Sequence, residues 1–169
     1  EYFLSANHHL RKYAESQEYE HNEKAIEILF KALKKDGANP IILSRLGDAY
    51  LNRVTYGYGE QWLDSAAFLS SKAIQEHPEV SQVWFLSGRV HFMKGNISEA
   101  KLHFTKTLEL MPNHSDALEQ LGFILVNQED FKTGIPMMIH SLRLDPRNYK
   151  RFENLYGNMG YFLSAAGLY

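Results

Sequence analysis

The sequence contains no cysteine, which excludes disulfides, thiolate zinc sites and a cysteine nucleophile. It also lacks an excess of one charge: 18 Lys and Arg residues oppose 20 Asp and Glu residues, so no overall field favours nucleic acid as a partner. No apolar run approaches the roughly 20 residues that span a bilayer. We therefore expect neither nucleic-acid binding nor membrane insertion by this segment.

The common catalytic and cofactor motifs are also missing. The glycine-containing run at 56–59 lacks the Lys and Ser/Thr that complete a phosphate-binding loop, and no Gly-x-Ser-x-Gly elbow occurs. Eight histidines are present, but His8 and His9 point to different helix faces, and no spacing gathers the three or four ligands that a metal site needs. We predict a protein with no catalytic residues, metal or cofactor.

A fixed spacing is the strongest feature that the sequence does have. Pro78, Pro112 and Pro146 lie 34 residues apart, and so do Gly88 and Gly122. A period of this length is typical of stacked helical hairpins, in which each hairpin covers the apolar face of the next. Such proteins bind partners over an extended surface, so a binding surface is expected before an active site.

One repeat, residues 81–114, shows how each hairpin is built. Large apolar residues at helical spacing fill 82–93, and Lys94-Gly95-Asn96 supplies a helix end followed by a new start. A second apolar stripe begins at Ile97 and ends before Pro112. The pattern predicts two antiparallel helices. Small residues, Gly122 with Gly134 in the next repeat, fall where the two helices of a hairpin should meet.

This repeat resembles the tetratricopeptide repeat (TPR) family. Trp84, Gly88, Ala100, Phe104 and Pro112 match the family pattern directly. The departures are Ser87, His91 and Thr107, and the following repeat matches through Leu121, Gly122 and Pro146. The resemblance implies an all-α, right-handed superhelical solenoid of antiparallel helix pairs, with about nine helices.

The repeats suggest one TPR-like domain over 1–169. It contains a degenerate repeat at 1–37, an elongated repeat at 40–80 with an inserted loop at 54–60, regular repeats at 81–114 and 115–148, and a partial repeat at 149–169. This layout resembles the TPR regions of bacterial multidomain signalling proteins, which are linked to kinase, adenylate cyclase or transcription-regulator domains. The resemblance implies a fragment of a longer protein. The sequence leaves its compartment open, with the cytoplasm slightly favoured over the periplasm.

The family places its ligand groove on the first helix of each hairpin. A non-catalytic scaffold for a protein or peptide partner is therefore the leading functional expectation. Phe and Met at helical spacing are, however, more often core than binding surface. Transfer of the groove positions to this sequence selects Asp48, Leu51, Asn52, Phe85, Arg89, Phe92, Met93, Glu119, Phe123, Val126 and Asn127. The clamp that holds acidic chaperone tails in this family is absent, because Ser44, Asp48, Leu86, Asp116 and Gln120 occupy its positions.

Two other functions remain open from the sequence. One is a regulatory or dimerisation domain, in which the apolar helix expected at 149–169 pairs with a second copy. The other is a secretion chaperone, although the layout fits that group poorly. The aromatic residues Tyr56, Tyr58 and Trp62 around the inserted loop form either a recognition site or a plug over adjacent helices, and the plug is favoured. Pro136 predicts that its helix begins near Thr133.

Overall fold

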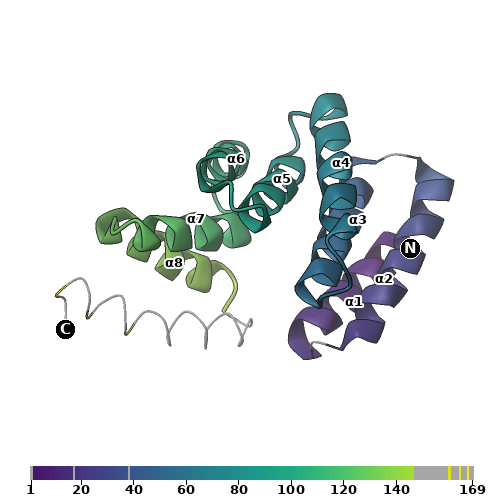
Figure 1. Cartoon of the computed structure of the whole chain (residues 1–169), viewed down its shortest axis with the longest axis horizontal. Helices are drawn as coiled ribbons and strands as arrows, with labels where there is room; N and C mark the ends of the chain where they lie inside the picture. Colours follow the sequence, from purple (N-terminus) through teal and green to yellow (C-terminus); the bar gives the residue numbers. More distant parts are fainter. Residues whose placement is uncertain are drawn as a thin grey trace. The chain divides into compact units, whose positions relative to one another are not determined.

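A computed structural model describes residues 2–16, 18–37 and 39–146, together with the single residues 160, 164 and 167. Within these residues the regular structure is entirely helical, as the sequence predicted (Figure 1). The helices are α1 (Tyr2–Ser16), α2 (Tyr19–Asp36), α3 (Pro40–Thr55), α4 (Gln61–Glu76), α5 (Ser81–Met93), α6 (Ile97–Leu110), α7 (Ser115–Asn127) and α8 (Phe131–Leu144). The ninth expected helix, 149–169, lies outside the continuously described ranges.

The chain forms two compact units. The N-terminal unit comprises residues 1–96 and contains α1–α5, and the C-terminal unit begins at Ile97 and contains α6–α8. The most extensive packing joins consecutive helices in pairs: α1 with α2, α3 with α4, and α7 with α8. These are the helical hairpins that the repeat period predicts. The expectation that 1–169 forms one domain stays a prediction.

Local sequence explains where the helices of the N-terminal unit begin and end. The helix α2 ends at Gly37, whose φ of 74° is a conformation that glycine adopts without strain. Two residues later, the side chain of Asn39 accepts a hydrogen bond from the backbone N–H of Ile41, and Pro40 starts α3. Glycine after one helix and a capping Asn with Pro before the next therefore define this connection.

The core of the N-terminal unit combines large side chains with alanines. Leu29, Leu46 and Leu51 are fully or almost fully buried, and Ala25 and Ala32 of α2 are fully buried beside them. Small side chains at these positions let neighbouring helices approach closely, so the larger residues can fill the space between them. A second cluster joins Leu43, Ala73 and Val83 of α3, α4 and α5.

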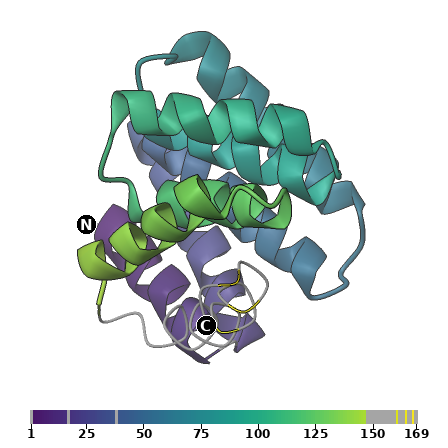
Figure 2. The same ribbon diagram turned by 90° about the vertical axis from the view of Figure 1, so that its left-hand side faces the viewer.

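The C-terminal unit contains the closest helix contact of the predicted kind. The helices α7 and α8 lie side by side in both views (Figure 1, Figure 2). A Cβ atom added to Gly122 would lie 2.9 Å from the carbonyl oxygen of Gly134, and one added to Gly134 would lie 2.7 Å from the carbonyl oxygen of Gly122. Real Cβ atoms do not come this close to backbone oxygens. The two glycines therefore meet where the repeat pattern places them.

The start of α8 differs from the sequence expectation. The helix begins at Phe131, so Pro136 lies inside it, and the predicted late start near Thr133 is wrong. The earlier start is stabilised by Asp130, whose carboxylate accepts a hydrogen bond from the backbone N–H of Thr133. The buried residues Ile135 and Met138 then keep the segment packed despite the backbone bond that the proline removes.

Candidate interaction surface

The N-terminal unit brings two of its first helices, α3 and α5, into direct contact. Gly47 of α3 lies against Leu86 of α5, because a Cβ atom added at Gly47 would come within 2.4 Å of the Leu86 side chain. Leu86 is fully buried. The missing side chain at position 47 therefore lets the two helices pack closely and sets the spacing of the residues beside them.

An ion pair crosses the same contact. Arg89 donates a hydrogen bond from NH1 to Oδ1 of Asp48 at 2.6 Å, and Arg45 lies 3.5 Å from the other carboxylate oxygen of Asp48. Asp48 is buried, with an 11% exposed side chain, whereas the side chain of Arg45 is 39% exposed. One buried carboxylate thus faces two cations, and this strip of α3 and α5 carries a net positive charge.

The other predicted groove residues of this unit divide into buried and partly exposed ones. Leu51 is fully buried in the core, and Phe85 is 9% exposed, so neither offers a large apolar surface to a partner. Phe92 and Met93 are partly exposed near the end of α5, and Met93 also packs against the core cluster. The accessible apolar part of the predicted groove in this unit is therefore formed by Phe92 and Met93.

Asn52 belongs to a polar network that the sequence did not reveal. Its side-chain amide donates to Oδ1 of Asn22 at 3.0 Å, and the Asn22 amide donates to the backbone oxygen of Ala49 at 3.0 Å. Asn22 is completely buried, although it lies on the polar-looking first turn of α2. A buried amide with satisfied donors and acceptors joins α2 to α3 and orients Asn52.

A second cross-helix contact, also missed from the sequence, lies next to this network. Arg53 of α3 donates to both carboxylate oxygens of Glu23 on α2, with 2.8 Å between Nε and Oε1. Its guanidinium group also lies 4.0 Å from the centre of the Trp62 ring, which in turn packs against Tyr50. The hydrogen bonds from Arg53 lower the pKa of Glu23. These contacts hold α2, α3 and the start of α4 together.

The aromatic residues of the inserted loop contact α1 and α2, although Tyr58 remains 49% exposed. The connection between α3 and α4 runs from 56 to 60, and its Tyr58 stacks on Tyr19 of α2 with 4.1 Å between ring centres. Tyr56 contacts both Tyr13 of α1, at 5.7 Å, and Tyr19, at 5.8 Å. Burial raises the pKa of Tyr13 to about 12. The loop thus lies over α1 and α2 in the manner of the plug that the sequence favoured.

The predicted groove residues of the C-terminal unit all lie on α7. Val126 is almost fully buried against α8, Phe123 is partly buried, and Asn127 is exposed with its amide donating to the backbone oxygen of Phe123 at 2.7 Å. Glu119 is partly buried, and this burial raises its pKa to about 7. Of this set, Phe123, Asn127 and Glu119 have accessible surface.

The described residues contain no group of three or more His, Asp or Glu side chains arranged to hold a metal ion. No helix in the described part of the chain is long and apolar enough to cross a membrane. The homodimer expected through 149–169 concerns residues outside the described part, and it stays a prediction.

Comparisons with solved structures identify the fold. A thermophilic TPR protein from Thermus thermophilus, TTC0263, superposes with a TM-score of 0.67 over 94% of this chain and 90% of that protein, at 13% identity. A structure of MamA gives a TM-score of 0.58 over 88% of this chain and 80% of the other, at 20% identity. The fold is therefore all-α and TPR-like, as the repeat pattern predicted.

Comparisons with curated sequences find partial relatives. The chain is 36% identical to the peroxisomal targeting signal receptor of Saccharomyces cerevisiae over 72 residues, which are 41% of this chain and 12% of the receptor. It is 29% identical to the human protein O-mannosyl-transferase TMTC1 over 104 residues, 61% of this chain and 11% of that protein. The bovine BBSome complex member BBS4 is 22% identical over 129 residues, 76% of this chain and 23% of BBS4. The chain spans less than a quarter of each relative. No family model matches it.

Proposed function

We propose that this chain is a protein-interaction scaffold that binds a segment of a partner protein along α3 and α5, without catalytic turnover. Support comes from the fold, which builds surfaces from stacked helix pairs, and from the name of one relative, a targeting signal receptor. A receptor of that kind binds a protein segment, which is the class of ligand we assign here. Larger regulatory proteins of bacteria remain the context that the sequence layout suggests.

The observation that carries the proposal is the mixed surface on α3 and α5. Arg45 and Arg89 flank the buried Asp48, and Phe92 and Met93 add accessible apolar surface about one turn further along α5. Ion pairing and the close packing at Gly47 keep the two helices in a defined arrangement before a partner arrives. A preformed surface loses less conformational entropy on binding, and apolar anchors beside charged groups are typical of peptide recognition.

The contacts also indicate which predicted groove residues should matter. Buried Leu51 and Phe85 would support the surface from below, so substitutions there should act on stability. Phe92 should act on binding, because its exposed part can contact a partner directly. Phe68 provides a matched control: it is an aromatic residue on α4 that is 69% exposed and lies outside the proposed surface.

The test is a selection of binding peptides from a random library on the wild-type chain, followed by affinity measurements with single variants. We expect Phe92→Asp to weaken binding at least tenfold, which is the loss of one modest hot spot, and Phe68→Asp to leave it unchanged. Circular dichroism and light-scattering mass should be the same for both variants. If Phe92→Asp binds the selected peptides as tightly as the wild type does, α3 and α5 do not form the binding surface. If the Phe92→Asp variant changes from dimer to monomer, the self-association alternative is favoured.

A further inference from the structure

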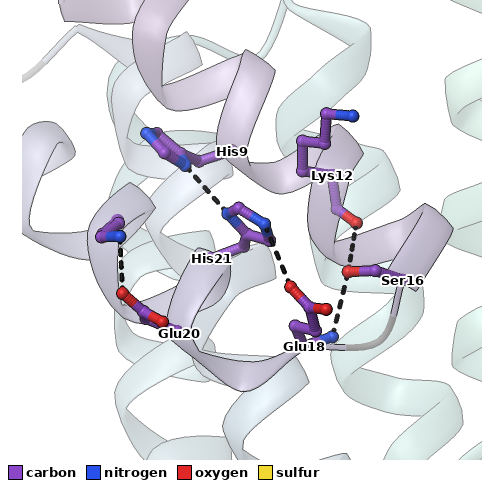
Figure 3. A network of polar contacts seen from close by, with 7 residues as sticks. His9, Lys12, Ser16, Glu18, Glu20 and His21 are labelled. Carbon is purple, nitrogen blue, oxygen red and sulfur yellow. Dashed lines mark hydrogen bonds and ion pairs between the residues drawn. The ribbon is translucent and has the colours of Figure 1, made fainter.

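Two histidines face each other between the first two helices. His9 of α1 and His21 of α2 place their Nδ1 atoms 3.2 Å apart, with 5.4 Å between ring centres (Figure 3). Both side chains are partly buried. No local pattern in the sequence pairs His9 with a residue of the next helix, because the contact depends on how the two helices pack.

The distance restricts how many protons the pair can carry. A hydrogen bond between two ring nitrogens needs one N–H donor and one lone pair, so one Nδ1 is protonated and the other accepts. An imidazolium ion carries a proton on both nitrogens. If His9 and His21 were both charged, two N–H groups would point at each other and the hydrogen bond would be lost. A second proton is therefore disfavoured while α1 stays docked on α2.

The two rings have different neighbours. A carboxylate oxygen of Glu18 lies 3.4 Å from Nε2 of His21, on the side away from His9. There it can accept a hydrogen bond from Nε2 when this atom carries a proton (Figure 3). The ring of His9 instead lies edge-on to His8, with 5.6 Å between the ring centres. Burial lowers the pKa of His9, and His21, His8 and Lys24 lower it further.

The remaining charged groups near this contact are already matched. Lys24 of α2 bonds Glu20 at 2.6 Å, and Glu23, on the side of α2 that packs against α3, is held by Arg53. Lys12 of α1 is a further basic residue of this helix, and its backbone oxygen accepts a hydrogen bond from the Ser16 hydroxyl. With both rings charged, two positive groups would face each other across the 3.2 Å between the Nδ1 atoms, so protonation of both rings is repulsive.

We propose that His9 and His21 form a proton-sensitive latch, which holds α1 on α2 at neutral pH and loosens α1 when both rings become charged in mild acid. Among the described helices, α1 packs extensively only against α2, so repulsion at this contact acts on the docking of the whole helix. The apolar contacts of Ala6 and Tyr13 remain in acid, which makes loosening, and not complete unfolding, the expected response. This inference is independent of the proposed binding surface on α3 and α5.

The latch predicts a specific pattern of hydrogen exchange in the full chain. After correction for intrinsic rates, protection of the amides in 2–16 should fall about tenfold between pH 7.5 and pH 5.5. An interaction of one pK unit between two coupled sites limits the fall to about tenfold, and stronger coupling makes it larger. Protection in α3 and α4 should change much less. The variant His9→Gln removes one titrating ring, and its α1 should respond to pH much less than that of the wild type.

A control and a second variant keep the test decisive. His140→Gln changes an exposed histidine of α8 and should leave the response of 2–16 intact. If His9→Gln does not fold, His21→Gln tests the same contact from α2. An unchanged pH response in the variant would overturn the latch. A response that disappears on addition of EDTA would also overturn it, because a metal ion would then replace the shared proton.

Discussion

Replacement of Gly134 by alanine should separate α7 from α8. The new Cβ atom would lie 2.7 Å from the carbonyl oxygen of Gly122 and 3.0 Å from the backbone nitrogen of Val126. Neither backbone atom can move aside without a shift of the helix. Overpacking of this kind costs about 3 kcal/mol at the upper end of its usual range, and the better helix propensity of alanine offsets about 1 kcal/mol. We expect a net loss of about 2 kcal/mol.

A matched substitution at Gly47 separates steric clash from helix propensity. There, the added Cβ atom would meet only the side chain of Leu86, which can move more easily than backbone. Because both variants gain the same propensity, Gly47→Ala should lose about 1 kcal/mol or less. The contrast between the two variants therefore measures what the glycine at 134 contributes to helix approach.

Local hydrogen exchange is the suitable assay, because the chain has two units and a single global transition is not assured. Both tryptophans, Trp62 and Trp84, lie in the N-terminal unit, so their fluorescence would report on Gly47→Ala but not on Gly134→Ala. Exchange of the α7 and α8 amides should accelerate about 30-fold in Gly134→Ala, as about 2 kcal/mol implies. A Gly134→Ala variant as stable as the wild type would refute the close backbone contact.

Two further predictions concern charged groups. Arg53→Met should destabilise the N-terminal unit by about 2 kcal/mol, because it leaves the Glu23 carboxylate without its bidentate partner and removes the contact with Trp62. Urea unfolding followed by tryptophan fluorescence measures this loss. The double variant Arg53→Met with Glu23→Gln should recover part of the lost stability. Burial raises the pKa of Glu119 to about 7, so its contribution to stability is fully present below the unfolded pKa and is lost as the pH rises through 7. Exchange protection of the α7 amides should therefore fall between pH 5 and pH 8 by the equivalent of about 2 kcal/mol, after allowance for partial exposure. The variant Glu119→Gln should abolish this pH dependence. If Glu119→Gln loses protection with pH as the wild type does, another group causes the pH dependence.

Some features of the fold could be predicted from the sequence because they depend on local or periodic signals. The 34-residue period predicted helical hairpins, and the spacing of Gly122 and Gly134 predicted their contact, since each copy of a repeat places equivalent residues at equivalent positions. The ends of α2 and α5 follow from the glycines at 37 and 95, which adopt positive φ angles. The start of α8 differs from the position that Pro136 predicts, because the Asp130 carboxylate caps a helix that starts two residues before Thr133 and tertiary packing tolerates the proline inside it.

The sequence by itself determined the class of fold, the helix pairs and the helices on which a partner surface is sought, because periodicity and capping act between residues near one another in the chain. Only the tertiary structure decided which polar side chains meet. Asp48 pairs with Arg89 across 41 residues, and Glu23 pairs with Arg53 across 30. His9 meets His21 through the antiparallel arrangement of two helices. Such pairs depend on helix rotation and approach, which core packing sets, and no local pattern in the sequence specifies them.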